Sequence, residues 1–280
     1  MPGGPAVRRA STGIDGGKRN VLGVMVDVID YDAAVARVIA AARDRRPFIL
    51  SALAVHGVMT GVASRAHNAR LNAFDVVAPD GQPVRWALNL LHGAGLRDWV
   101  SGPDLTLRVL RRAAADALPV YLYGSTAPTV ERLAESLTEA LPPLRIAGAE
   151  PSKFRTAHPG EPERIAERIN RSGARLVLVG LGCPRQEAFV HAMRPLLAMP
   201  LLAVGAAFDY HAGLLTPAPL PMQRYGLAWL WRLSREPRRL WRRYLLLGPG
   251  YLARLAAQKT RLWIPVAPEP VYRPPEPPPV

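Results

Sequence analysis

The chain has 280 residues, a formal net charge of +14 and hydrophobic residues at 49% of its positions. That length suits one large α/β domain, or one domain with an appendage, and the apolar content supports a sizeable core. The positive charge points to an anionic partner: nucleic acid, anionic lipid or a phosphorylated substrate. The single cysteine, Cys183, excludes an intramolecular disulfide and favours a reducing compartment.

Both ends of the chain differ in composition from its middle. Residues 1–19 contain no apolar run, so we expect a disordered N-terminal tail and no signal peptide. Residues 259–280 are rich in proline and are also expected to form a disordered tail. No charge-free apolar stretch of about 18 residues occurs, so we expect no membrane-spanning helix.

Short apolar runs alternate with amphipathic segments between residues 20 and 216. The expected strands are 21–28 (one strand or a hairpin), 48–55, 74–78, 120–123, 144–147, 176–179 and 201–205. The expected helices are 30–43, 57–72, 82–91, 102–117, 126–140, 162–171 and 184–197. This alternation predicts an α/β fold with βαβ units and a largely parallel sheet that has helices on both faces.

The most informative stretch is LVLVGLGCPRQEAFV, residues 176–190. It predicts a buried strand, a glycine-rich turn at 180–183 and a helix opened by Pro184. A helix that starts beside the carboxyl end of a strand is a common place for phosphate to bind. The spacing fits an ordinary strand–helix junction with solvated polar residues equally well.

A second candidate position follows the expected strand 74–78. Asp80 stands between Pro79 and Gly81, where a carboxylate serves either as a turn former or as a site residue. Asp75 is too far from Asp80 to form an acidic metal-binding pair with it, so no metal ligands are predicted.

The character of the chain changes after Asp209. Residues 217–222 are rich in proline, and residues 224–243 hold seven arginines, three tryptophans and one acid. Pro237 should end one helix and begin another. Arg239 and Arg242 are three residues apart, so on a helix they share a face. The composition fits a solvated face, a nucleic-acid patch or an interfacial membrane helix.

Several motifs, taken in this order, resemble one family. They are the strand around Ser51, APDG with Asp80, GLGCPRQE from residue 180, VGAAFDYHAG from residue 204 and GLAWLWRLSREPRRLWRR from residue 226. Together they resemble the WecG/TagA/CpsF glycosyltransferases (glycosyltransferase family 26) over residues from about 20 to 250. The last motif is the most specific of them.

The resemblance implies a Rossmann-like core over 20–216 and a C-terminal Arg/Trp-rich helical appendage over 217–258, which docks on the membrane and closes the active site. It implies an inverting, metal-independent enzyme without a cofactor. Such enzymes move an N-acetylmannosamine-type sugar or a uronic acid from a UDP-sugar to a polyprenyl-diphosphate-linked sugar. They work at the cytoplasmic membrane face in teichoic acid, capsule or exopolysaccharide synthesis.

The implied partners are therefore the UDP-sugar donor, the lipid-linked acceptor and the anionic membrane surface. The implied location is cytoplasmic, peripheral on the inner face of the cell membrane. The sequence leaves the oligomeric state open, a homo-oligomer included.

Site residues carry over by their matches to the family motifs. Asp80 matches the catalytic base. The arginines expected to grip the diphosphate are Arg232, Arg239 and Arg242, which leaves Arg235, Arg238 and Arg243 for lipid or solvent. The substrate-binding positions are Ser51, Gly81, Gly124, Gly182 and Gln186. One carboxylate is enough to take a proton from the acceptor, and arginines must neutralise the leaving diphosphate where no metal does so.

Alternatives remain. Leu53, Pro217 and Ala228 stand where the family usually has asparagine, arginine and glutamate, which leaves open an inactive relative acting as a membrane-associated scaffold. A basic nucleic-acid-binding protein would explain the charge, but no nucleic-acid motif is present and we expect no nucleic acid as partner. A nucleotide-dependent oxidoreductase would need a G-x-G-x-x-G run after the first strand, and the chain has none.

Overall fold

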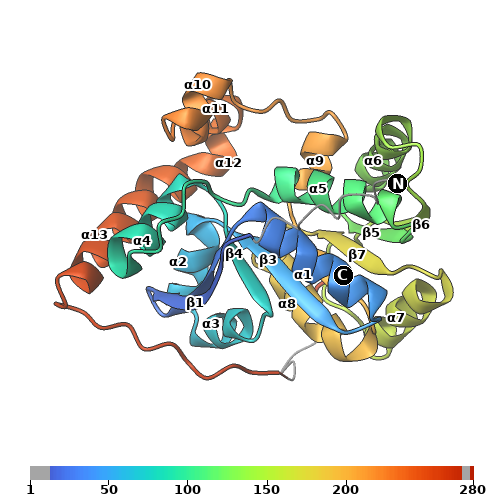
Figure 1. The fold of residues 1–280 in the computed structure, drawn as a ribbon, viewed down its shortest axis with the longest axis horizontal. Helices are drawn as coiled ribbons and strands as arrows, with labels where there is room; N and C mark the ends of the chain where they lie inside the picture. The colour runs from blue at the N-terminus through green and yellow to red at the C-terminus, as the bar shows by residue number, and fades with distance from the viewer. Residues whose placement is uncertain (1–12, 273–277) are drawn as a thin grey trace, which may run out of the picture.

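The computed structural model describes residues 13–272 and 278–280. Its centre is a six-stranded sheet in the order β4-β3-β8-β7-β5-β6 (Figure 1). The strands are β3 (Phe48–Leu53), β4 (Val76–Pro79), β5 (Val120–Gly124), β6 (Ile146–Glu150), β7 (Leu176–Gly180) and β8 (Pro200–Ala203). Every neighbouring pair is parallel, so the carboxyl ends of all these strands lie along one edge.

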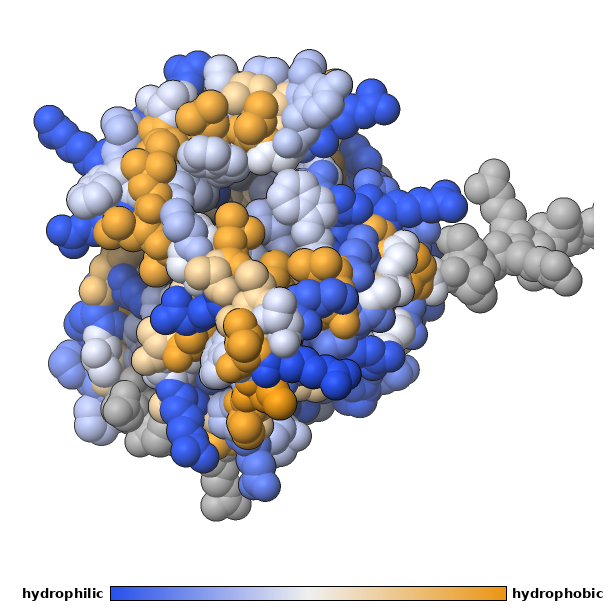
Figure 2. Space-filling model, turned by 90° about the vertical axis from the view of Figure 1, so that its left-hand side faces the viewer, coloured by the Kyte–Doolittle hydropathy of each residue, from blue (hydrophilic) through white to orange (hydrophobic). Residues whose placement is uncertain are grey.

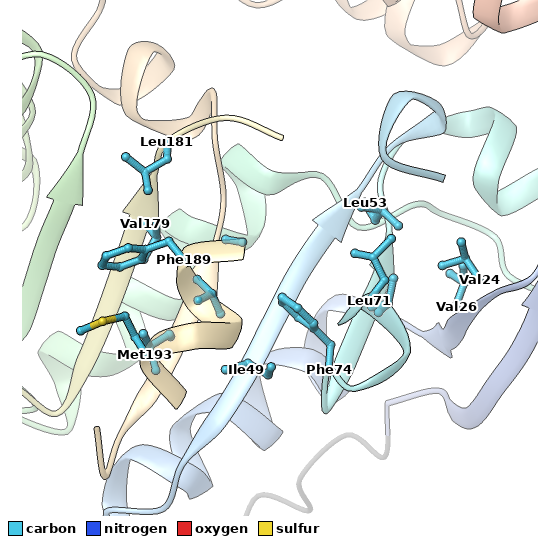
Figure 3. Packing of buried hydrophobic residues seen from close by; sticks show 14 of the residues in the cluster. Val24, Val26, Ile49, Leu53, Leu71, Phe74, Val179, Leu181, Phe189 and Met193 are labelled. Atoms are coloured by element: carbon cyan, nitrogen blue, oxygen red, sulfur yellow. The ribbon is translucent and has the colours of Figure 1, made fainter. Parts of the chain in front are cut away.

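Strand side chains alternate between two hydrophobic clusters, one on each face of the sheet. Ile49 and Val179 belong to the first cluster (Figure 3), and their neighbours Leu50 and Leu178 belong to the second. The first face is covered by α2 (Val55–Ala63), α3 (Arg65–Asn72), α7 (Glu161–Arg171) and α8 (Arg185–Met193). The second is covered by α1 (Tyr31–Arg43), α5 (Gly102–Ala115), α6 (Ala127–Ala140) and α9 (Ala207–His211). The predicted α/β fold is therefore confirmed.

The expected helix at 57–72 is two helices, α2 and α3. Ser64 separates them with an extended backbone, and its hydroxyl accepts a hydrogen bond from the amide of His67 at 3.2 Å. Serine offers this local bond as a helix N-cap, which competes with continuation of the preceding helix. Two further helices are α4 (Gln82–His92) and the 3₁₀ turn at Arg194–Leu196.

A β-hairpin replaces the disorder expected for residues 15–19. Strand β1 (Asp15–Val21) pairs antiparallel with β2 (Val24–Ile29). Lys18 forms an ion pair with the buried Asp27 at 2.9 Å, and the same carboxylate accepts from the amide of Val77 at 2.7 Å. The sequence-based expectation missed β1 because its residues are mostly glycine and charged residues. Residues 1–12, also expected to be disordered, lie outside the described residues.

The C-terminal segment forms a chain of helices. They are α10 (Leu220–Arg224), α11 (Ala228–Arg235), α12 (Pro237–Trp241), a π-helical turn (Arg242–Leu246) and α13 (Leu247–Lys259). α10 to α12 stand apart from the sheet at the top of Figure 1, and Pro237 separates α11 from α12 as predicted. Within the described part of the chain, no helix is both long and apolar enough to cross a membrane.

The last helix, α13, is packed onto the core. Tyr251 is 1% exposed, and its hydroxyl donates to the carbonyl of Pro83 at 3.1 Å. Gln258 bonds both the amide of Leu22 and the carbonyl of Asn20. These contacts give the arginine-rich helices before α13 a fixed support.

Residues 260–272 lack regular secondary structure, yet they lie against the core rather than forming the expected disordered tail. Proline carbonyls act as acceptors: Asn20 donates to Pro265 at 2.8 Å and Asn72 to Pro268 at 3.1 Å. Val280 is fully buried and exchanges backbone hydrogen bonds with Arg155. Residues 273–277 lie outside the described residues.

Candidate active site

The sheet changes winding direction between β5 and β7. These two strands are neighbours, but α6 leads from β5 to β6 on one side, whereas α8 leads from β7 to β8 on the other side, and the two helices lie on opposite faces of the sheet. Such a switch point opens a crevice at the carboxyl ends of the strands, where open α/β sheets bind ligands.

Asp80 lies at this edge, directly after β4. Its amide donates to the carbonyl of Leu53 at the end of β3, at 3.2 Å. Burial raises the pKa of the Asp80 carboxyl group to about 6, and the positive charges of Arg232 and Arg243 and a hydrogen bond from the amide of Gly102 oppose this rise. A carboxyl group with this pKa is mostly ionised at neutral pH and is still able to take up a proton.

Two arginines of the C-terminal helices lie near enough to Asp80 for their charges to lower its pKa, and one of them was not predicted to lie in the site. Arg232 on α11 was expected in the site, whereas Arg243 was assigned to lipid or solvent. Arg242, which was expected to grip diphosphate, is exposed and stacks on Trp241 with its guanidinium carbon 5.3 Å from the ring centroid. The π-helical turn at 242–246 adds a residue to the turn, so spacing in an ordinary helix does not give the inward-facing residue.

Arg239 takes an intermediate position. Its guanidinium group pairs with Glu236 at 2.9 Å, and its side chain is 59% exposed. Its charge also reaches Asp209 on α9, where it opposes the rise in pKa that burial causes. Of the three predicted arginines, the structure therefore places Arg232 beside Asp80, Arg239 farther out and Arg242 on the surface.

Ser51 and Gln186 meet through a residue that sequence reasoning did not select. The Ser51 hydroxyl and the Gln186 side-chain amide both donate to Oε1 of Glu187, at 3.0 Å and 2.9 Å. All three residues are buried, and burial raises the pKa of the Glu187 carboxyl group. Because neither Ser51 nor Gln186 is exposed, both predicted substrate-binding residues form the wall behind the crevice rather than its open surface.

The predicted glycines have different structural roles. A Cβ atom on Gly124 would lie 2.8 Å from the backbone of Gly180, so glycine lets the ends of β5 and β7 approach closely. Gly182 has φ +76° and open space around it, which fits close approach by a ligand. Gly81 precedes α4 with φ +83°, beside Asp80.

One group of described residues has metal-ligand chemistry. The ligand atoms of His67, Cys183 and Glu187 lie within 4.8 Å of one another. However, the Arg70 guanidinium group, which can only donate, lies 3.2 Å from Nδ1 of His67. Nδ1 therefore accepts from Arg70, and the ring hydrogen of His67 is on Nε2. This N–H faces Cys183 and Glu187, so Nε2 cannot bind a metal together with them. Asp75 lies at the opposite end of β4, where it pairs with Arg194. Neither arrangement fits a metal.

Sequence reasoning missed Glu187 and Arg243, and only Glu187 could have been predicted from the residue pattern. Glu187 precedes the buried Val190 by three residues, so on a helix it belongs to the same buried face. A buried acid next to Gln186 was therefore predictable from spacing. No such signal marks Arg243, because its orientation depends on the π-helical turn.

The glycosyl transferase WecG/TagA/CpsF family matches residues 19–264. One curated relative is the N-acetylglucosaminyldiphosphoundecaprenol N-acetyl-beta-D-mannosaminyltransferase of Bacillus spizizenii. It is 30% identical to this chain over 187 residues, which cover 66% of this chain and 70% of the relative. The chain therefore belongs to the WecG/TagA/CpsF family and is a glycosyltransferase.

Proposed function

We propose that this chain transfers an N-acetylmannosamine-type sugar, or a related uronic acid, from a UDP-sugar to a polyprenyl-diphosphate-linked sugar. The observation that carries the proposal is a partly desolvated carboxylate, Asp80, at the carboxyl edge of the sheet beside the charges of Arg232 and Arg243. The name of the Bacillus relative, which describes transfer to a diphosphoundecaprenol-linked sugar, supports the acceptor class and the sugar.

In the proposed reaction, a hydroxyl oxygen of the acceptor attacks the anomeric carbon of the donor. The bond from that carbon to the UDP oxygen breaks, and its electron pair leaves with the diphosphate. Asp80 takes the proton of the attacking hydroxyl as general base. Attack opposite the leaving group inverts the anomeric configuration. Arg232 and Arg243 neutralise the charge that develops on the diphosphate, so the step requires no metal.

The turns after β5 and β7 are the proposed place for UDP. Gly182 leaves open space there, and α8 begins two residues beyond the turn at Cys183. Gln186 and Ser51, held by Glu187, form the rigid wall of this crevice. A rigid wall keeps the donor in one orientation, which lowers the entropic cost of reaching the transition state.

The proposed location is the inner face of the cell membrane, reached by peripheral contact. Hydrophobic and hydrophilic side chains lie side by side on the face of α4 and α13 (Figure 2). The exposed apolar residues of the C-terminal helices include Leu220, Tyr225, Leu245, Leu246 and Leu252. Exposed arginines such as Arg235 and Arg238 accompany them. Apolar side chains beside cations suit an anionic lipid surface.

The reaction itself can be tested with a panel of UDP-sugars and a soluble acceptor carrying N-acetylglucosamine on a short isoprenyl diphosphate. We expect one donor to give product in buffer containing a chelator, at a rate equal to that with added Mg²⁺ or Mn²⁺. Product formation would be followed by mass spectrometry, and the anomeric configuration by NMR. Strict dependence on a divalent ion, or retained configuration, would contradict the proposal.

Replacing Asp80 with Asn should lower turnover by roughly 10²–10⁴-fold, the usual share of a general base. The isosteric amide should leave the thermal unfolding midpoint unchanged or higher, because the buried site no longer has to accommodate a charge. In the unsubstituted enzyme, activity should fall as the pH drops through about 6, where Asp80 becomes protonated. Near-normal turnover of Asp80→Asn would remove this residue from the mechanism.

Replacing Arg243 with Gln should shift the acidic limb of the pH–rate profile upward, because a positive charge that lowers the pKa of Asp80 is lost. The maximal rate should also fall. Arg242→Gln is the matched control: it removes a neighbouring, exposed arginine and should leave the limb in place. Equal profiles for the two variants would show that Arg243 does not face Asp80 in solution.

Replacing Leu245 and Leu246 together with Ser should weaken binding to vesicles that contain an anionic phospholipid, because two exposed apolar side chains are lost. Vesicle co-sedimentation at low and moderate salt would measure the change, and salt should weaken the remaining arginine-dependent binding. The control is Phe154→Ser, an exposed apolar residue outside the C-terminal helices. Unchanged binding of the double variant would refute docking through this segment.

A further inference from the structure

A cavity of about 230 Å³ lies between the core and the C-terminal helices. Its core wall is Tyr210 on α9 with the loop that follows, and its other wall is formed by Trp231, Arg232 and Glu236. The Trp231 ring is held in place, because its Nε1 donates to the carbonyl of Thr216 at 3.2 Å. The cavity therefore exists because α11 is fixed against the core at this point.

The polar groups of the cavity are incompletely paired. The Nε atom of Arg232 is buried and has no hydrogen-bond partner among the residues that the structure describes. The Glu236 carboxylate lies 3.9 Å from the Arg232 guanidinium group and 2.9 Å from that of Arg239. A buried donor without a partner is costly, so it is a strong indication that a ligand or water completes the site.

The combination of groups fits a saccharide. A pyranose ring has an apolar C–H face that packs against aromatic rings, and hydroxyl groups at its rim that need both donors and acceptors. Tyr210 and Trp231 supply the rings, Arg232 supplies a donor, and Glu236 supplies an acceptor. Pockets that join apolar walls to a few placed polar groups are typical of small-molecule sites.

The position of the cavity indicates whether it holds the donor sugar or the acceptor sugar. Arg232 and Tyr210 both interact electrostatically with Asp80, so the cavity adjoins the proposed base. The turns proposed for UDP follow β5 and β7, whereas this cavity lies between α9, which follows β8, and α11. The acceptor hydroxyl must reach Asp80 to give up its proton, so the acceptor sugar must lie beside this carboxylate.

We propose that the cavity formed by Tyr210, Trp231, Arg232 and Glu236 binds the saccharide unit of the lipid-diphosphate acceptor. This assignment rests on the proposed function. It makes Trp231 and Tyr210 determinants of acceptor recognition, separate from the donor-binding residues.

The test compares two soluble probes, N-acetylglucosamine diphosphate linked to a short isoprenyl chain and the same isoprenyl diphosphate without the sugar. We expect the full-length protein to bind the first about tenfold more tightly, equivalent to about 1.4 kcal/mol. In Trp231→Ala this advantage should fall below about threefold, and affinity for UDP should stay unchanged. Isothermal titration calorimetry measures both quantities without relying on catalysis.

Two further variants complete the test. Trp229→Ala is the matched control, because Trp229 lies on the same helix but packs against Tyr244 rather than lining the cavity, and it should keep the sugar advantage. Tyr210→Leu removes the opposite wall and should reproduce Trp231→Ala. Equal binding of both probes to the unsubstituted protein, or an advantage that survives both cavity variants, overturns the assignment. Weakened UDP-sugar binding with an intact advantage would assign the cavity to the donor and also overturn it.

A different result would contradict the proposed function without contradicting the cavity assignment. If the unsubstituted protein transfers no sugar from any UDP-sugar but shows the sugar advantage, the reaction assignment is wrong and the cavity assignment stands.

Discussion

The parallel sheet is buried on both faces, and this constraint determines where polar chemistry can occur. The described strand residues between Leu176 and Val179 are at most 1% exposed. A polar side chain within such a layer must find a partner in the interior, because an unpaired group there costs about 1–3 kcal/mol. Ser51 on β3 obeys this rule, because its hydroxyl donates to the Glu187 carboxylate. Reactive groups that must meet substrate are therefore confined to the carboxyl edge.

The C-terminal helices add to this edge what the sheet does not contain. The core supplies one carboxylate at the end of β4, and the arginines beside it come from α11 and the π-helical turn. Their positions depend on α13, where Tyr251 and Leu255 belong to the same hydrophobic cluster as the strands. An arginine-rich segment that is exposed over much of its length is thus placed by a few buried residues at its end.

The sequence predicted the parts of the structure that depend on short-range patterns. Alternating apolar runs located the sheet strands, and the break at Pro237 followed from its missing N–H group. Apart from the break at Ser64, which has a local cause, the errors arose where long-range contacts decide. β1 is glycine-rich and is held by pairing with β2, and the proline-rich segment at 260–272 is held by Asn20 and Asn72. In the proposed site, the motif around Asp80 predicted a residue at the carboxyl end of a strand, which is where Asp80 lies, but the position of Arg243 depends on a π-helical turn that no spacing rule revealed.

The same guanidinium groups have two effects in the proposed reaction, and these effects are separable. Their charge holds the pKa of Asp80 below the value that burial alone would produce, which keeps the base ionised at neutral pH. Their charge also neutralises the diphosphate as its bond to the sugar breaks. The first effect determines the pH at which activity is lost, whereas the second determines the rate that is reached when Asp80 is fully ionised. An arginine that contributes to both must therefore change the position and the height of the pH–rate profile together, and an arginine that binds only lipid changes neither.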